Sequence, residues 1–312
     1  MNIVHYSPLR YPGGKKKLAA FIAKICMDNN VNGHYVEPYA GGSSVAIFLL
    51  LEGFVDRITI NDKDRSIYAF WHSVLNNTKE LCRRIQECEI THENWLAQKA
   101  IQDNKKKAKL IDLGFSTLFM NRTNRSGIIN GGIIGGVDQE GDYKMDCRFN
   151  KSEIITRIQR IAKFKSRIRL YKKDAIQLIE KIQNEAENEN IIFYFDPPYY
   201  LKASTLYLNH YKDADHREVS ERIQEIRGLR WIVSYDNVPE IQELYEGRPR
   251  KEYSFSHTAY ETRVGNEILF FSDNLITPDI EDYNPVSFKH RRVANEIRII
   301  YKPTKRSKKK KR

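Results

Sequence analysis

Apolar residues in the first quarter of the chain recur at two spacings, that of a helix and that of a strand. Residues 18–27 have helical spacing, residues 34–37 form a short strand, and residues 45–52 are helical again. Residues 57–61 alternate as a second strand, and residues 66–75 resume the helical spacing. A strand, a glycine turn, a helix and a second strand ending in an acid predict a βαβ unit of a doubly wound α/β sheet.

The middle of the chain interrupts this rhythm. Residues 79–118 are helical without a strand pattern, residues 121–142 are rich in glycine and asparagine, and residues 153–169 place isoleucines on one helical face. The alternation then returns, with strands predicted at 191–195, 230–235 and 267–272 and a helix at 217–227. The sequence therefore predicts a sheet with an inserted, mainly helical domain.

This pattern divides the chain into three predicted parts. The sheet domain comprises residues 1–78 and 151–285, and the insert comprises residues 79–150. Residues 286–312 form a basic C-terminal tail.

Composition narrows the class of protein. The 312 residues are 41% hydrophobic, enough for one large domain or two small ones with a packed core. No apolar run approaches the roughly 18 residues of a membrane span, and no secretory signal is evident, so we expect a cytoplasmic protein without a membrane partner. The four cysteines form no C-x-x-C pair, so we expect neither a disulfide scaffold nor a metal site.

The strongest chemical signal is Asp196-Pro197-Pro198-Tyr199, directly after a strand of five apolar residues. A rigid turn is the purely structural alternative, because two prolines fix φ and remove two donors. In the chemical interpretation, the Asp196 carboxylate and the Pro197 carbonyl each accept one N–H of an exocyclic amine, which frees its lone pair for an electrophile. The Tyr199 ring offers a stacking face for a base, which must then leave the duplex.

A second candidate site follows the first predicted strand. The stretch VEPYAGG at 36–42 places Glu37 and Gly41 in a turn where backbone can approach an adenosine-type ligand closely. Ser43 and Ser44 can cap the next helix. Asp62 ends the second strand, about 20 residues further on, where an acid can bind ribose hydroxyls. The alternative for Asp62 is an N-cap of the following helix.

Six motifs occur in order along the chain: RYPGGK at 10–15, VEPYAGG at 36–42, IND at 60–62, FMNRTNRSG at 119–127, CRFN at 147–150 and DPPYY at 196–200. This ordered set resembles the Dam-type DNA adenine methyltransferase family. The resemblance implies a Rossmann-like methyltransferase sheet, S-adenosylmethionine as methyl donor, and N6 of adenine in double-stranded DNA as acceptor.

The resemblance also implies roles for single residues. Tyr11 and Lys15 correspond to positions that contact the cofactor, Asp62 to the acid of the second strand, and Asp196 to the first residue of the D-P-P-Y motif. Two positions depart from the family pattern. Tyr11 stands where a tryptophan is common, and Lys63 with Asp64 follows the second-strand motif where an uncharged residue is preferred.

The insert contains the candidate DNA contacts. Side chains suited to bidentate base contacts in the major groove are Asn121, Arg122, Asn124 and Arg125. Between residues 148 and 173 there are ten Lys or Arg against one acid. A solvated face is the usual meaning of such a run, but beside the insert it predicts phosphate contacts. The glycine-rich residues 131–136 are either a loop that orders on DNA or an ordinary hairpin.

Alternatives stay open for the acceptor and for catalysis. Cytosine N4 enzymes of related type usually carry serine in place of Asp196, which favours adenine. Cytosine N4, RNA, a protein amide, and a non-catalytic DNA-binding module all remain alternatives. Cytosine C5 chemistry needs a nucleophilic cysteine, and none of the four follows a proline. The sequence also leaves open whether a cognate restriction endonuclease acts separately on the same DNA.

Five further residues carry weaker expectations. Direct attack by an adenine nitrogen needs no covalent intermediate, so His210 is expected to be structural or near the flipped base rather than a general base. His216 is expected to cap a helix or face solvent. Tyr260, Glu261 and Arg263 are expected to border the base pocket.

The positive charge of the chain is concentrated at its end. The net charge is +12; residues 289–312 hold twelve basic residues and one acid, which leaves 40 against 39 in the rest. The stretch KPTKRSKKKKR predicts a disordered tail. Deleting residues 303–312 is expected to weaken DNA binding and its salt dependence without changing the target sequence.

Overall fold

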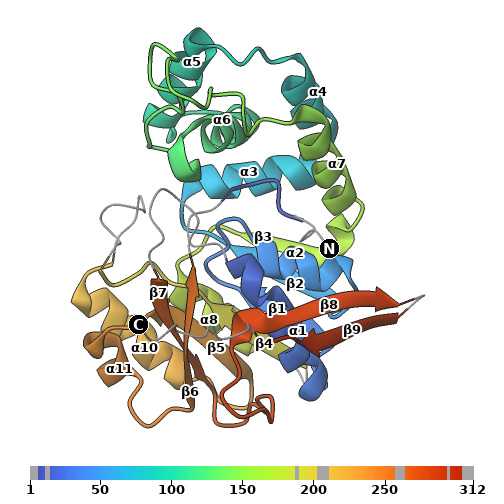
Figure 1. Ribbon diagram of the computed structural model, residues 1–312, viewed down its shortest axis with the longest axis vertical. Coiled ribbons are helices and arrows are strands. Elements are labelled where there is room, and N and C mark those ends of the chain that lie inside the picture. Colours follow the sequence, from blue (N-terminus) through green and yellow to red (C-terminus); the bar gives the residue numbers. More distant parts are fainter. Residues whose placement is uncertain are drawn as a thin grey trace, which may run out of the picture.

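The computed structural model describes residues 6–10, 15–186, 190–201, 211–256, 264–293 and 296–303. At its centre is a seven-stranded sheet in the order β3-β2-β1-β4-β5-β7-β6, accompanied by a two-stranded hairpin, β8-β9 (Figure 1). The strands are β1 (His34–Glu37), β2 (Arg57–Asn61), β3 (Ile168–Tyr171), β4 (Ile191–Phe195), β5 (Arg230–Asp236), β6 (Arg250–Ser256), β7 (Val264–Phe271), β8 (Phe288–Val293) and β9 (Glu296–Tyr301).

Strand pairing in the large sheet is parallel from β3 to β5 and antiparallel on both sides of β7. Parallel neighbours need crossover connections, which place helices on the faces of the sheet. The helices beside the sheet are α1 (Ala19–Asp28), α2 (Ser44–Leu51), α8 (Ala175–Glu185), α10 (Asp213–Gln224) and α11 (Pro239–Leu244), and the 3-10 turn η1 (Lys15–Leu18) precedes α1. The predicted Rossmann-like α/β fold is confirmed.

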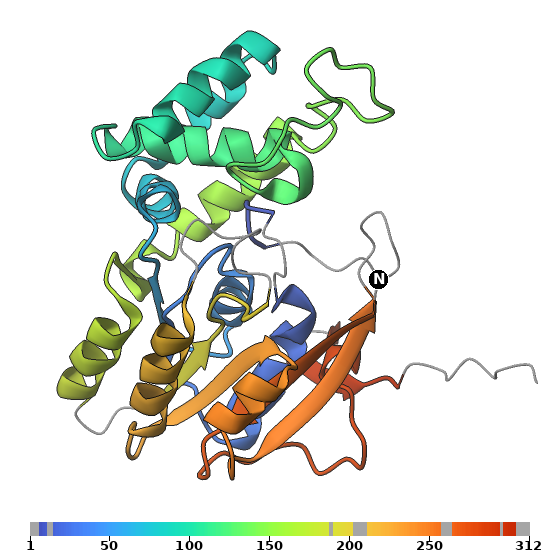
Figure 2. The ribbon, with the colours of Figure 1, turned by 90° about the vertical axis from the view of Figure 1, so that its left-hand side faces the viewer.

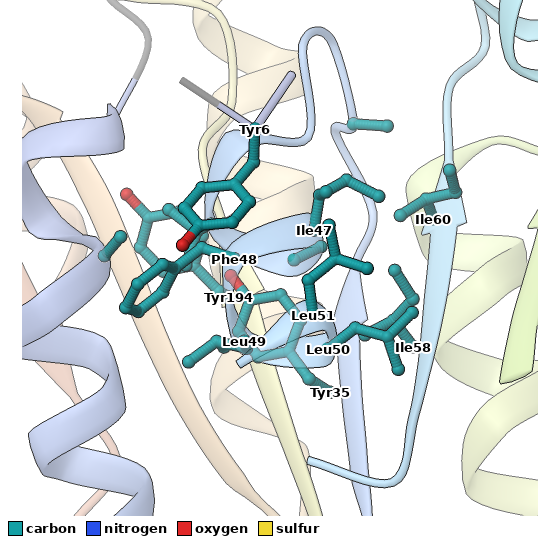
Figure 3. Close-up of a cluster of buried hydrophobic side chains, with 14 of the residues drawn as sticks. Tyr6, Tyr35, Ile47, Phe48, Leu49, Leu50, Leu51, Ile58, Ile60 and Tyr194 are labelled. Carbon is teal, nitrogen blue, oxygen red and sulfur yellow. The ribbon is translucent and has the colours of Figure 1, made fainter. Parts of the chain in front are cut away.

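Burial on both faces explains why β4 is apolar throughout. Ile192 and Tyr194 join a core with α1 and α2, whereas Phe193 and Phe195 join a second core with α8, α10 and α11. Figure 3 shows the first core where α2 packs on β1 and β2. Because side chains alternate between the faces, successive residues of β4 enter one core and then the other.

The helical region lies at the opposite end of the molecule from the lower edge of the sheet (Figures 1 and 2). Its helices are α3 (Arg65–Asn76), α4 (Thr78–Glu87), α5 (His92–Asp103), α6 (Leu110–Thr123) and α7 (Lys151–Ala162), and the short turn η2 (Arg125–Gly127) follows α6. α3 packs against α6, and α7 packs against α3 and α4. The helical region therefore spans residues 65–162, wider than the predicted 79–150, because apolar faces of the flanking helices are buried within it.

The predicted helix at 153–169 is too long. α7 ends at Ala162, and Ile168–Tyr171 forms edge strand β3, whose residues pair with β2. The helical spacing of apolar residues continues beyond Ala162, but residues 168–171 form a strand because they hydrogen-bond to β2. The sequence pattern also missed β6, which pairs only with β7.

The predicted basic tail begins too early. Residues 288–293 and 296–301 pair as the β8-β9 hairpin, which packs against α1. Phe288 is buried against Phe21, and the His290 ring lies 4.9 Å from that of Phe48. Alternate inward residues of β8 thus cover a core face despite the basic residues between them. Residues 304–312 lie outside the described residues.

Candidate active site at the carboxyl edge of the sheet

The carboxyl ends of β1, β2 and β4 lie at one edge of the sheet, with β1 between the other two. The helix after β1 covers one face, and the helix after β4 covers the other. In open α/β sheets, ligands bind at such a point, where the connections diverge. The acids at this edge are Glu37, Asp62 and Asp196.

Asp196 directly follows β4, and its side chain is 25% exposed. Its Oδ1 accepts a hydrogen bond from Ser234 Oγ at 2.7 Å and lies 3.3 Å from Lys15 Nζ. No described residue donates to its Oδ2. Burial raises the pKa of Asp196 to about 6, against the Lys15 ammonium, which lowers it. At pH 7 Asp196 is therefore mainly a carboxylate with one oxygen open to a new donor.

Lys15 is held among acids and hydroxyls, and its side chain is only 5% exposed. Its Nζ donates to Tyr199 OH and to Glu267 Oε1, each at 2.9 Å. The hydroxyls of Tyr199 and Tyr253 both donate to the Glu267 carboxylate. Burial alone would lower the pKa of Lys15, but Asp196 and Glu267 outweigh it and raise the pKa well above its ordinary value. Lys15 thus stays cationic and ties Asp196 to β7.

Sequence reasoning did not identify Glu267, Tyr253 or Ser234. Glu267 opens an otherwise apolar stretch, and a buried acid is rare unless paired, which is the one available signal. Its neighbours follow from strand register, which places it opposite Asp236 of β5 and opposite Tyr253 of β6. That register joins residues far apart along the chain, so the motifs alone could not show it.

The rest of the D-P-P-Y motif differs partly from expectation. Pro197 is buried, Pro198 is half-buried, and no described residue donates to the Pro197 carbonyl. Tyr199 is buried, and the Lys15 ammonium lies 4.8 Å from its ring centroid. The ring is therefore not exposed as an open stacking face in this structure, because the residue is buried and its hydroxyl is bonded to Glu267.

Asp236 holds the chain where it leaves the motif. Its carboxylate accepts the backbone N–H groups of Tyr200 and Leu201 at 2.9 and 3.1 Å. Since Asp236 ends β5, the neighbouring strand fixes the path of the segment after Tyr199.

The glycine turn after β1 is bonded on both sides. Gly41 and Ser43 have φ values of +44° and +43°. The Gly41 N–H donates to Asp62 Oδ2 at 2.9 Å, and its carbonyl accepts from Trp71 Nε1 at 3.0 Å. The predicted cap by Ser43 is wrong: its left-handed backbone turns the hydroxyl back to the Ala40 carbonyl, and no side chain caps α2.

Asp62 pins this turn. Besides the Gly41 N–H, the Asp62 carboxylate accepts the N–H of Asp64 at 2.9 Å. Burial raises the pKa of Asp62 to about 7, and the nearby Asp64 carboxylate raises it further in the same direction. The N-cap of α3 is Asp64, which accepts from Ser66 N–H, so the capping alternative does not apply to Asp62. Each carboxylate oxygen has two acceptor sites, so Asp62 can still accept ligand hydroxyls.

Glu37 ends β1 and is buried. Tyr35 OH lies 3.5 Å from its Oε1, whereas the buried Oε2 has no hydrogen-bond partner among the described residues. Burial raises the pKa of Glu37 well above its ordinary value. A buried carboxyl oxygen without a partner indicates a place where a polar group of a ligand fits.

Three of the four predicted base-reading side chains are enclosed by the protein. Asn121 and Asn124 are 1% and 0% exposed, and Arg122 is also buried. Asn124 accepts from Trp95 Nε1 and donates to two backbone carbonyls, and the other two bond to the N-terminal arm. The prediction is wrong for these three in this structure, because the side chains are buried and bond within the chain, although the Arg122 Nε has no partner among the described residues. Arg125 is exposed and remains a candidate for base contacts.

The glycine-rich stretch folds back on the end of α6. Ile133 forms a β-bridge with Asn124, and the Ile134 N–H donates to the Thr123 carbonyl at 2.9 Å. The Arg125 N–H donates to the Gly132 carbonyl, also at 2.9 Å. Of the two alternatives, the ordinary hairpin-like return describes this structure.

The basic run at 148–173 divides into two sets. Five members bond to backbone carbonyls or acids of the chain: Lys151, Arg157, Arg160, Arg167 and Arg169. Others are exposed: Arg148, Lys163, Lys165 and Lys172. The first set joins parts of the fold, and the second set is the part that suits phosphates.

Several predicted residues lie outside the described residues: Tyr11, His210, Tyr260, Glu261 and Arg263. His216 is buried, not at the surface. Its Nδ1 lies 3.0 Å from Tyr235 OH, and its ring packs against Tyr200 and Tyr211. Aromatic packing across the start of α10, which sequence spacing does not show, encloses it.

All four cysteines are free. In the described part of the chain, no group of three or more His, Cys, Asp or Glu side chains could hold a metal ion. Within the same residues, no helix is both long and apolar enough to cross a membrane.

Comparison with known proteins matches the chain to a protein family. The family model described as D12 class N6 adenine-specific DNA methyltransferase matches residues 11–262. The chain matches none of the curated proteins. Among solved structures it is similar to the rRNA methyltransferase aviRa from Streptomyces viridochromogenes, at 10% identity and a TM-score of 0.31, over 80% of this chain and 82% of that chain.

Proposed function

The chain belongs to the D12 class of N6 adenine-specific DNA methyltransferases, and from that premise we propose that it methylates an adenine flipped out of double-stranded DNA, with S-adenosylmethionine as donor. The observation that carries this proposal is the open acceptor pair at the end of β4. Asp196 keeps Oδ2 free while Ser234 and Lys15 hold Oδ1, and the adjacent Pro197 carbonyl is also free.

The proposed cofactor contacts surround the end of β1. The unpaired Oε2 of Glu37 suits a polar group of a ligand, and Asp62 both shapes the turn at Gly41 and retains acceptor capacity. Lys15 and Tyr11 complete the set implied by the family pattern. S-adenosylmethionine, when bound, supplies a methyl group on a positively charged sulfur, which leaves as a neutral thioether once the nitrogen–carbon bond forms.

The chain prepares the adenine amine for this transfer. The Asp196 carboxylate and the Pro197 carbonyl each accept a hydrogen bond from one N6–H group, so the nitrogen becomes tetrahedral and its lone pair is available. After the bond forms, one of these protons leaves N6, with the Asp196 carboxylate as its first acceptor. Lys15, held by Tyr199 and Glu267, keeps Asp196 ionised and oriented. An adenine reaches this edge only after it leaves the base stack.

We propose that DNA contacts come from the exposed basic side chains of the helical region, with Arg125 as base-reading candidate. The reaction is the same whether the enzyme acts alone or beside a restriction endonuclease. A nuclease that cuts the same target sequence when it is unmethylated would show that the enzyme acts beside a restriction endonuclease.

The test is long-read detection of methylated bases in DNA from cells that express the protein, with nucleoside analysis of digested DNA. We expect N6-methyladenine within one short recurrent sequence. Asp196→Ala should lower methyl transfer by at least about 100-fold, because a group that stabilises the transition state is removed. Asp56→Ala, at an exposed acid before β2, is the control and should stay active. Methylcytosine as product, or an active Asp196→Ala variant, would contradict the proposal.

A further inference from the structure

The N-terminal arm, residues 6–10, connects the two parts of the molecule. Its first described residue, Tyr6, belongs to the sheet part: the ring packs edge-on against Phe48 of α2 at 5.6 Å, and the hydroxyl donates to Glu52 (Figure 3). The residues after Tyr6 bond instead to the helical region. Five residues past Arg10 the chain reaches Lys15, which holds Asp196.

The side chain of Asn121 in α6 hydrogen-bonds to both main-chain polar groups of Arg10. Its Oδ1 accepts the Arg10 N–H at 2.8 Å, and its Nδ2 donates to the Arg10 carbonyl at 2.5 Å and to the Gly127 carbonyl at 2.8 Å. This two-way bond fixes both the position and the direction of the arm, as a neighbouring strand would. A buried amide used in this way serves the arm and is unavailable to DNA.

Three further groups hold the arm from the same side. Arg122 donates to the Pro8 carbonyl, and Arg157 of α7 donates to the Ser7 carbonyl at 3.0 Å. Gly127 has a φ of +77°, and a Cβ there would lie 2.4 Å from the Arg10 carbonyl oxygen. The close approach of the arm therefore needs glycine at position 127.

We infer that Asn121 is a positioning residue that fixes the helical region over the catalytic edge through the N-terminal arm. This inference rests on the proposed function. Arg125, the exposed base-reading candidate, lies one turn after Asn121, so the arm links the region that holds DNA to the residues around Asp196. A shift of about 1 Å at a reacting centre can cost about 100-fold in rate.

Asn124 provides a matched control. It is the same residue type at the end of the same helix, is equally buried, and also makes three hydrogen bonds. All three stay within the helical region, to Trp95, Ile128 and Ile129. Replacing Asn124 by alanine removes the same number of side-chain hydrogen bonds without releasing the N-terminal arm.

The experiment compares Asn121→Ala and Asn124→Ala with the wild type below their melting temperatures. Three quantities are measured: backbone amide hydrogen exchange in the arm, S-adenosylmethionine affinity by calorimetry, and the single-turnover methylation rate at saturating duplex. Asn121→Ala should speed exchange at Arg10 and lower the rate by about tenfold or more, with affinity for S-adenosylmethionine within about threefold. Asn124→Ala should melt at least as early but keep the exchange of the arm and the rate.

Arg157→Gln and Arg84→Gln form a second pair in case the asparagine variants do not fold. Arg157 holds the arm, whereas Arg84 pairs with Glu80 and Asp112 inside the helical region. Arg157→Gln should lower the rate and Arg84→Gln should not.

Two results would overturn the inference while the proposed function stands: a released arm with a wild-type rate, or equal rate losses in the arm variants and their controls. A wild-type protein that transfers no methyl group to DNA would overturn the proposed function and the inference with it.

Discussion

The loop after β4 and the turn after α6 both carry a dense run of hydrogen-bonding side chains, but only the first leaves an acceptor for a ligand. After β4, Asp196 has one oxygen bonded and one open. After α6, the amides of Asn121 and Asn124 bond within the chain. Residue type shows what a segment can bond to, and the surrounding fold decides how much of that capacity remains.

After the loss expected for Asp196→Ala, the next largest effect concerns Glu267, the acid that holds Lys15 beside the loop after β4. Glu267→Gln removes a charge that holds Lys15, and we expect about a tenfold to hundredfold loss of single-turnover rate at pH 8. The wild-type rate should fall as pH drops through about 6, where Asp196 becomes protonated. Because Glu267 also raises the pKa of Asp196, the acid limb should move to lower pH in the variant. Glu252→Gln, at an exposed acid of β6, is the control, and an unmoved limb would contradict the network.

A second comparison is between two acids at strand ends. Asp62 is bonded to two backbone N–H groups, whereas Asp196 is not saturated. Asp62→Asn should weaken S-adenosylmethionine binding by about tenfold, because it loosens the turn at Gly41 and removes a charge-assisted acceptor. Calorimetry measures the affinity. Unchanged affinity would assign Asp62 a purely structural role.

Within the turn after α6, Arg125 is the exposed exception. Arg125→Ala should weaken binding to the target duplex by about fivefold to tenfold and leave the melting temperature unchanged, as expected for a base contact near the low end of its range. Fluorescence anisotropy with target and scrambled duplexes measures this loss. Arg83→Ala, at another exposed arginine of the helical region, is the control. An equal loss on both duplexes would make Arg125 a phosphate contact.

The smallest effect is on stability. Burial raises the pKa of Asp196 from 3.8 to about 6, so the folded chain binds this proton more tightly than the unfolded chain. The contribution of Asp196 to the free energy of unfolding therefore falls as pH rises between those values. Asp196→Asn should melt a few degrees above the wild type at pH 8, with the difference shrinking towards pH 4. A variant that melts lower at pH 8 would show that the ion pair with Lys15 outweighs the burial cost.

Much of the sheet follows from local pattern. The strands at 34–37, 57–61 and 191–195 match β1, β2 and β4. β4 is apolar along its whole length because both of its faces are buried, and the isoleucines of β2 alternate with more polar residues. β3 and the β8-β9 hairpin were not predicted. Basic residues interrupt each of these strands, and hydrogen bonding to a partner strand or packing on α1 decides their structure.

The sequence by itself determined the order of motifs, hence the family, and which polar residues stand at the strand ends. Only the tertiary structure decided which polar groups are already bonded. Glu267 meets Lys15 across 252 positions of the chain, and Asn121 meets Arg10 across 111. Local propensity holds no information about such pairs, because strand register and helix packing create them.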